Sequence, residues 1–168
     1  MRKHSEDLLA AINSLSALER RLRGKLRVCV LDRSEVCHGY AAKALLAACC
    51  QLANEGYPDI LVEYTRKRSA SRKCVVVELK TCLSGKFKNL RKAFRGVCEK
   101  IENARQPLSS HGCASVSSVL VLPKEVRCKL RGVRAFCKSI TEVADPEGLP
   151  DVVRALIKDP GPRRGGFA

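Results

Sequence analysis

The hydrophobic positions of the chain follow two periodicities, and together they predict a domain built from helices and strands. Apolar residues recur at steps of three or four over residues 5–23, which predicts a first helix. Extended apolar runs at 26–31, 60–65, 74–81 and 116–122 predict strands. The polar segment 66–72 connects the second and third of these runs, so they are expected to form an antiparallel hairpin.

A second amphipathic helix is predicted after Ser84 and Gly85, which end the third strand. Its apolar stripe comprises Phe87, Leu90, Phe94, Val97, Cys98 and Ile101. The opposite side carries the basic residues Lys88, Arg91, Lys92 and Arg95. A loop is expected at 106–112, a basic stretch at 124–138 and a short helix at 151–158.

The order of these elements predicts an α/β fold, in which helices flank one mixed sheet. Residues 1–158 are expected to form a single domain, and 159–168 a flexible basic tail. The stretch 34–53 is left open, because its later part, 45–52, fits either a helix or a buried strand.

Charge adds a constraint on partners. The chain has 32 Lys and Arg against 17 Asp and Glu, a net charge of +15. This surplus favours a polyanion, and nucleic acid is the first candidate, with DNA preferred. No apolar run approaches the roughly 18 residues that span a bilayer, so no membrane partner is expected.

Ten cysteines lie along the chain without a CxxC pair. Zinc sites use closely spaced ligand pairs, so zinc is not favoured. The apolar run Leu8–Ile12 is too short for the core of a signal peptide, so we expect no secretion and therefore reduced thiols. Most of the cysteines are expected to be small buried hydrophobic residues.

One pair of short segments carries candidate chemistry: Tyr57-Pro58-Asp59 before a strand, and Glu78-Leu79-Lys80 at the end of the paired strand. Residues two apart in a strand share a face, so Glu78 and Lys80 point the same way, opposite to Val75, Val77 and Leu79. The hairpin is expected to bring Asp59 close to Glu78.

Two carboxylates and an amine are the groups that a Mg²⁺- or Mn²⁺-dependent phosphodiesterase needs. Asp59 and Glu78 would hold the metal, with the main-chain carbonyl of Leu79 as a further ligand. Lys80 would orient the attacking water or lower its pKa. Asp59, Glu78 and Lys80 are therefore the candidate catalytic residues.

This arrangement resembles the PD-(D/E)XK nucleases. Residues 78–82, Glu-Leu-Lys-Thr-Cys, are similar to the ELKTC segment of the herpesvirus nuclear proteins encoded by gene twenty-four of the unique long region. Pro58-Asp59 matches a Pro-Asp pair of that family, whereas Asn89-Leu90 stands where the family has Gln-Leu. The resemblance covers about residues 57–122.

The resemblance implies a restriction-endonuclease-like fold and residence in the host nucleus or nucleolus. It also implies an additional acid on an upstream helix, for which Glu19 and Glu35 are the candidates. This chain departs from the family in having no recognisable strand directly before Pro58.

Three interpretations of function are open. The first is a metal-dependent endonuclease in which Lys88, Arg91, Lys92 and Arg95 contact the nucleic-acid backbone. The alternative is a non-catalytic basic module with the same fold that binds nucleic acid or nuclear proteins. The third is a basic RNA-associated structural protein without a divalent-metal site. Arg66, Lys67 and Arg68 fit a hairpin tip on the backbone, a nuclear import signal or a solubilising surface equally well.

Overall fold

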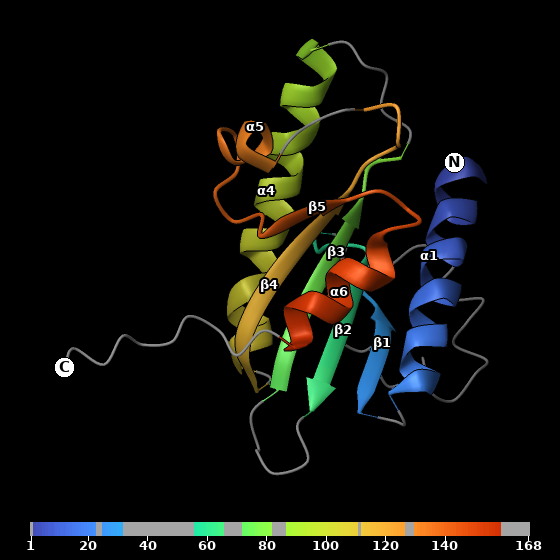
Figure 1. Ribbon diagram of the computed structural model, residues 1–168. Coiled ribbons are helices and arrows are strands. Elements are labelled where there is room, and N and C mark those ends of the chain that lie inside the picture. Colours follow the sequence, from blue (N-terminus) through green and yellow to red (C-terminus); the bar gives the residue numbers. More distant parts are fainter. Residues whose placement is uncertain are drawn as a thin grey trace, which may run out of the picture.

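The computed structural model describes residues 2–22, 25–31, 56–65, 72–81, 87–110, 112–126 and 130–158 (Figure 1). The undecided stretch 34–53, the predicted tail and the hairpin tip Arg66–Arg68 lie outside the described residues, as does Glu35.

The described strands form one mixed sheet. They are β1 (Leu26–Val30), β2 (Ile60–Thr65), β3 (Arg72–Leu79), β4 (Cys113–Val121) and β5 (Glu142–Ala144), and their order in the sheet follows the sequence. β2 is antiparallel to β1 and β3, whereas β3, β4 and β5 are parallel to one another. The predicted hairpin of β2 and β3 is therefore confirmed.

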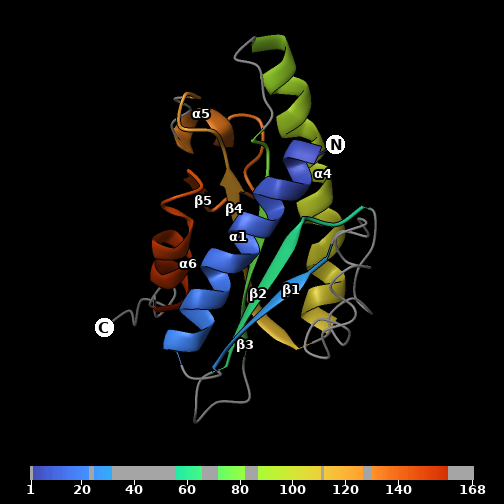
Figure 2. The same cartoon turned by 90° about the vertical axis from the view of Figure 1, so that its right-hand side faces the viewer.

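Helices cover both faces of this sheet, which gives three layers (Figure 2). α1 (Arg2–Arg21) and α6 (Leu149–Lys158) lie on one face, and the long helix α4 (Phe87–Ser110) lies on the other. α5 (Leu130–Arg134) is a short helix that follows β4. The mixed α/β architecture expected from the sequence is thus present.

Alternation along each strand separates two hydrophobic cores. One core joins α1 and α6 to the sheet, with Leu15, Val62 and Val77 among its buried residues. The other joins α4 to the opposite face, with Val76 and Ile101 among its buried residues. The strands β2 and β3 are therefore buried on both faces over most of their length, which explains their near-continuous apolar runs.

One prediction of local structure is wrong, and one strand of the sheet is missing from the predicted elements. Residues 106–110 were expected in a loop but are helical, because Leu108 continues the buried stripe of Ile101 and Ala104 and so holds the last turns of α4 on the sheet. Strand β5 was not predicted at all. It is three residues long and forms by pairing with Val119–Val121.

The expectation of reduced thiols is also wrong for the described residues. Cys74 is joined to Cys113, and Cys98 to Cys137, with Cα–Cα distances of 5.8 and 5.4 Å. The first disulfide links β3 to β4, and the second links α4 to the segment after α5. The expected burial of the cysteines is confirmed for Cys29, Cys74, Cys113 and Cys137.

Candidate functional site

The register of the β2–β3 hairpin places Asp59 beside Glu78. Ile60 pairs with Val77, so the next position on each strand brings the two acids across from one another. Backbone bonds hold both positions in the sheet: Leu31 N–H donates to the Asp59 carbonyl (2.9 Å), and Lys80 N–H donates to the Val121 carbonyl (2.9 Å). The sheet therefore fixes this site on its four adjoining strands.

The faces are as predicted. Val75, Val77 and Leu79 belong to the core under α1 and α6, whereas Cys74 and Val76 belong to the core under α4. Glu78 follows Cys74 and Val76 at a spacing of two residues, so Glu78 and Lys80 lie on the same side of the sheet as α4.

Asp59 is fully buried and is oriented by the neighbouring strand. Its Oδ2 accepts a hydrogen bond of 2.7 Å from the main-chain N–H of Leu79. Leu79 thus contributes its amide to the site, while its side chain packs in the core on the other face. A carboxylate held by a backbone donor is fixed relative to Glu78, one residue earlier in β3.

Glu78 receives two ammonium groups on one oxygen. Lys80 Nζ lies 2.9 Å and Lys100 Nζ lies 3.0 Å from Glu78 Oε1. Oε2 is buried and has no hydrogen-bond partner among the described residues. The Glu78 carboxylate is therefore ion-paired through Oε1, while Oε2 is a buried acceptor without a hydrogen-bond partner in the described chain.

Burial raises the pKa of Glu78 above its ordinary value of 4.5, and the Asp59 carboxylate raises it further. Lys80 and Lys100 act in the opposite direction and lower it. The net upward direction shows that the two lysines do not offset the loss of water and the repulsion between the two acids.

Lys100 is a member of this site that the sequence analysis did not identify. It lies on α4 between Val97 and Ile101, which are both buried against the sheet. The only feature of the sequence that points to Lys100 is its position, as a basic residue, at the edge of the apolar stripe of α4. Its contact with Glu78 depends on where α4 crosses β3, which periodicity does not specify.

The expected upstream acid is not found at the site among the described residues. Glu19 lies near the end of α1, on the other face of the sheet, and burial raises its pKa while Arg27 lowers it. Asp7, at the beginning of α1, accepts a hydrogen bond from the Thr81 hydroxyl, also on the α1 side. Neither acid approaches Glu78 from the α4 side.

The predicted basic face of α4 is exposed as expected at Arg91, Lys92 and Arg95. The side chain of Lys88 lies outside the described residues. Phe136 adjoins this face: its ring lies 6.2 Å from that of Phe94, and the Arg91 guanidinium lies 5.8 Å from its centroid. It is the one large hydrophobic side chain exposed among the described residues.

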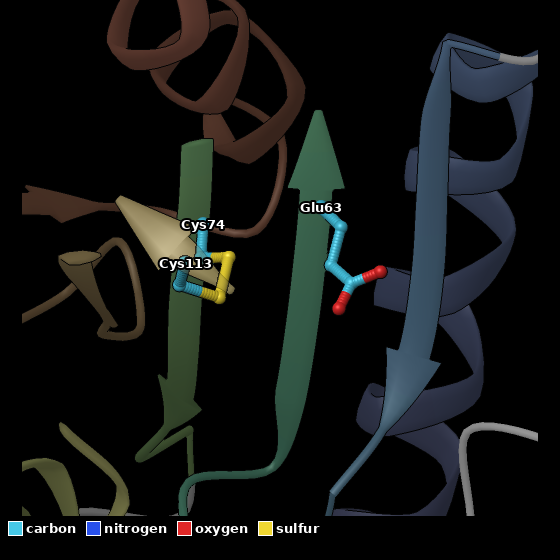
Figure 3. A group of neighbouring side chains, drawn as sticks. All are labelled: Glu63, Cys74 and Cys113. Carbon is cyan, nitrogen blue, oxygen red and sulfur yellow. A yellow bond between two sulfur atoms is a disulfide. The ribbon is translucent and has the colours of Figure 1, made fainter. Parts of the chain in front are cut away.

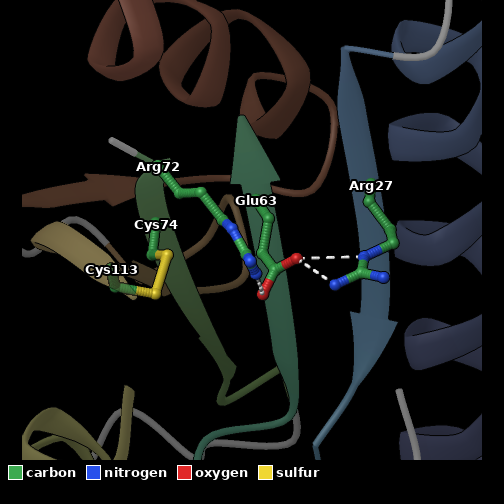
Figure 4. Close-up of polar contacts among 5 residues, drawn as sticks. All are labelled: Arg27, Glu63, Arg72, Cys74 and Cys113. Carbon is green, nitrogen blue, oxygen red and sulfur yellow. Dashed lines mark hydrogen bonds and ion pairs between the residues drawn. A yellow bond between two sulfur atoms is a disulfide. The ribbon is translucent and has the colours of Figure 1, made fainter. Parts of the chain in front are cut away.

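A second cluster on the same face of the sheet contains Glu63, Cys74 and Cys113, whose ligand atoms lie within 4.8 Å of one another (Figure 3). The two sulfur atoms form a disulfide, so neither is a thiolate, the form that binds metals. Glu63 is moreover paired with Arg27 (Figure 4). This cluster is therefore no metal centre in the structure.

Two further observations bear on function. No helix in the described part of the chain is both long and apolar enough to span a bilayer. Comparisons with protein-family models, with curated proteins and with solved structures find no match to this chain.

Proposed function

We propose that this chain is a metal-dependent endonuclease of the PD-(D/E)XK type. One observation carries the proposal: Asp59, Glu78 and Lys80 meet on one face of the sheet, at the end of β3, where Lys80 Nζ lies 2.9 Å from Glu78 Oε1. Two carboxylates and an amine in this relation are the groups that hydrolysis of a phosphodiester requires.

The donor atoms fit a hard divalent cation such as Mg²⁺ or Mn²⁺. Asp59 and Glu78 would hold it, together with the Leu79 carbonyl, and Glu78 Oε2 is a buried acceptor without a hydrogen-bond partner in the described chain. When bound, such a cation polarises the phosphate and stabilises the leaving oxygen. It would also offset the repulsion that now raises the Glu78 pKa.

The lysines have different tasks in this proposal. Lys80 forms an ion pair with Glu78, a proposed metal ligand. Its ammonium group would therefore lie next to the cation, where it can orient the attacking water and offset the charge that develops on the phosphate. Lys100 donates to the same oxygen from α4 and keeps Glu78 in place. Lys100 is thus a positioning residue.

The exposure of the side chains around the proposed metal centre indicates the direction from which a substrate reaches it. Both acids are buried, whereas Lys80 and Lys100 are 28 % and 27 % exposed. We therefore infer that the phosphate approaches from the side of the two lysines. Arg91, Lys92 and Arg95, exposed on α4, would contact neighbouring phosphates of the same backbone.

Topology and sequence motif support the same proposal. A mixed sheet with helices on both faces is what the restriction-endonuclease-like resemblance implies; Pro58-Asp59 directly precede β2, and β3 supplies the beginning of the Glu-Leu-Lys-Thr-Cys segment. The resemblance to the herpesvirus nuclear proteins would place this activity in the host nucleus or nucleolus.

A nicking assay on supercoiled plasmid, with Mg²⁺ or Mn²⁺, tests the proposal. Wild type is compared with D59N, E78Q and K80M, and with the control variants D151N and E99Q, which change exposed acids on α6 and α4. We expect nicking by wild type and both controls, and a loss of at least about 100-fold in each site variant. Equal nicking by all six proteins would refute the proposed site.

The alternative is a basic module that binds nucleic acid or nuclear proteins without cleaving. It is favoured by the two ion pairs of Glu78, which would serve as a purely structural link between β3 and α4. It predicts no metal-dependent nicking, with salt-sensitive binding that D59N and E78Q leave unchanged.

A further inference from the structure

A buried acid holds two arginines together at the end of the sheet away from the proposed metal centre. Glu63 is 3 % exposed and lies directly across from Arg27 in the β1–β2 register. Arg27 Nε donates to Glu63 Oε2 at 2.9 Å, and Arg72 Nη1 lies 3.9 Å from Oε1 (Figure 4). Glu63 is hydrogen-bonded to Arg27 and attracts Arg72 electrostatically, so both guanidinium groups gather around one carboxylate.

These residues line an open cavity of about 390 Å³, together with Lys25 and Thr65. Three of the five lining residues are cationic and one is anionic, which leaves a charge of 3 − 1 = +2. The exposed fractions of the Arg27 and Arg72 side chains are 42 % and 36 %, so their guanidinium groups reach solvent although Glu63 does not. The cavity is thus suited to an anion.

We propose that Lys25, Arg27 and Arg72 form a phosphate cradle, a site that binds a backbone phosphate of the same nucleic acid that the proposed metal centre would cleave. The guanidinium fork matches the geometry of phosphate oxygens and donates two hydrogen bonds to them. Thr65 adds a hydroxyl donor to the lining. The inference rests on the proposed function for the identity of its ligand.

The cradle and the proposed metal centre lie on the same side of the sheet but are separated by the buried core under α4, which includes Leu61 of β2. Arg27 and Glu63 alternate with core residues of the α1 face, so they lie on the α4 side of the sheet, as do Asp59 and Glu78. Glu63 lies four residues beyond Asp59 on β2, which corresponds to about 13 Å. At about 3.4 Å of helix axis for each nucleotide of one strand, a nucleic acid that passes around this core would need at least about four nucleotides to reach both sites.

The sequence around the cavity holds few acids. Glu63 is the single acid from residue 60 to residue 77, and it is the one that pairs with Arg27 and Arg72.

Fluorescence anisotropy with a labelled DNA duplex of about 20 base pairs tests the cradle, in EDTA and between about 50 and 200 mM KCl. The variants are R27Q and R72Q, each of which leaves Glu63 with the other arginine. The matched control is R154Q, an exposed arginine of α6 on the opposite face. The logarithm of the binding constant K falls as log[KCl] rises. We expect R27Q and R72Q each to make this negative slope shallower by about 0.9, the contribution of one phosphate contact, and R154Q to leave it unchanged.

The variant E63Q separates an organised cradle from bulk charge. It makes the protein more positive by one unit, so non-specific attraction alone predicts tighter binding. The cradle predicts weaker binding, because Arg27 and Arg72 lose the group that orients them, and thermal unfolding of E63Q confirms that the protein compared is folded. Tighter binding by folded E63Q, or equal slopes for R27Q, R72Q and R154Q, would overturn the inference.

This test does not depend on cleavage. If R27Q and R72Q weaken binding but wild type never nicks DNA in Mn²⁺, the cradle stands and the endonuclease proposal fails. If wild type nicks DNA but R27Q and R72Q bind DNA as wild type does, the endonuclease proposal stands and the cradle is refuted.

Discussion

Lys100, on α4, lies with its Nζ 3.0 Å from Glu78 Oε1, at the end of β3. This ion pair joins the helix to the sheet at the point where the two acids meet. It also lowers the Glu78 pKa, which burial and Asp59 raise.

Replacing Lys100 tests this link. In K100M, Glu78 loses one of its two ammonium partners while remaining buried, so its pKa is expected to rise further. We expect a loss of about 1–3 kcal/mol in the free energy of unfolding near pH 7, measured by urea denaturation. The control is K92M, an exposed lysine of the same helix. Equal losses in K100M and K92M would show that the ion pair contributes nothing.

The raised pKa of Glu78 predicts a pH dependence of stability. Because the folded state favours the protonated acid, it binds more protons than the unfolded chain between the ordinary pKa of 4.5 and the raised one. The contribution of Glu78 to stability is therefore full below 4.5 and is lost as pH rises through the folded-state pKa. E78Q does not titrate there, so its stability relative to wild type should increase with pH.

Urea denaturation of wild type and E78Q at several pH values between about 4 and 8 measures this difference. D151N, which removes an exposed carboxylate of α6, is the control for the loss of an acid elsewhere in the protein. A constant difference between E78Q and wild type would contradict the upward direction of the pKa.

The part of the site that lies within one hairpin follows from the sequence. Pro58 marks the beginning of β2 and alternation in 74–79 gives the faces, so the proximity of Asp59 to Glu78 and the common face of Glu78 and Lys80 are predictable from local patterns. Strand β2 is predicted at its observed bounds for the same reason.

What depends on tertiary contacts is not predictable in this way. Lys100 reaches Glu78 only because α4 crosses β3, and β5 exists only through its pairing with β4. The end of α4 was missed because Pro107 and two serines resemble a loop, although burial of Leu108 extends the helix. The disulfides join residues 39 positions apart, a distance over which spacing carries no signal.

The Cys74–Cys113 disulfide predicts a redox-dependent stability. This disulfide closes a loop with a sequence separation of 39 and so lowers the conformational entropy of the unfolded chain. The effect raises the free energy of unfolding by about 4 kcal/mol. We expect C74S to lose most of this amount under oxidising conditions, measured by denaturant unfolding. With excess dithiol reductant, wild type and C74S should become similar, and an equal stability of the two in oxidant would refute the contribution.

The exposed basic face of α4 predicts strongly salt-dependent binding to DNA. Removing Arg91, Lys92 and Arg95 together, as glutamines, should reduce the slope of log K against log[KCl] by up to about 2.7 if each contacts one phosphate. The matched control removes Arg20, Arg21 and Arg154, which are exposed on the helices of the other face. Equal effects of the two triple variants would show that net charge alone governs binding.

Calorimetric titration of Mn²⁺ into the protein measures directly whether Asp59 and Glu78 share a divalent cation. We predict one saturable site in wild type and in the control D151N, and no measurable binding by D59N or E78Q. The same binding isotherm in all four proteins, or no binding by wild type, would refute the proposed metal centre.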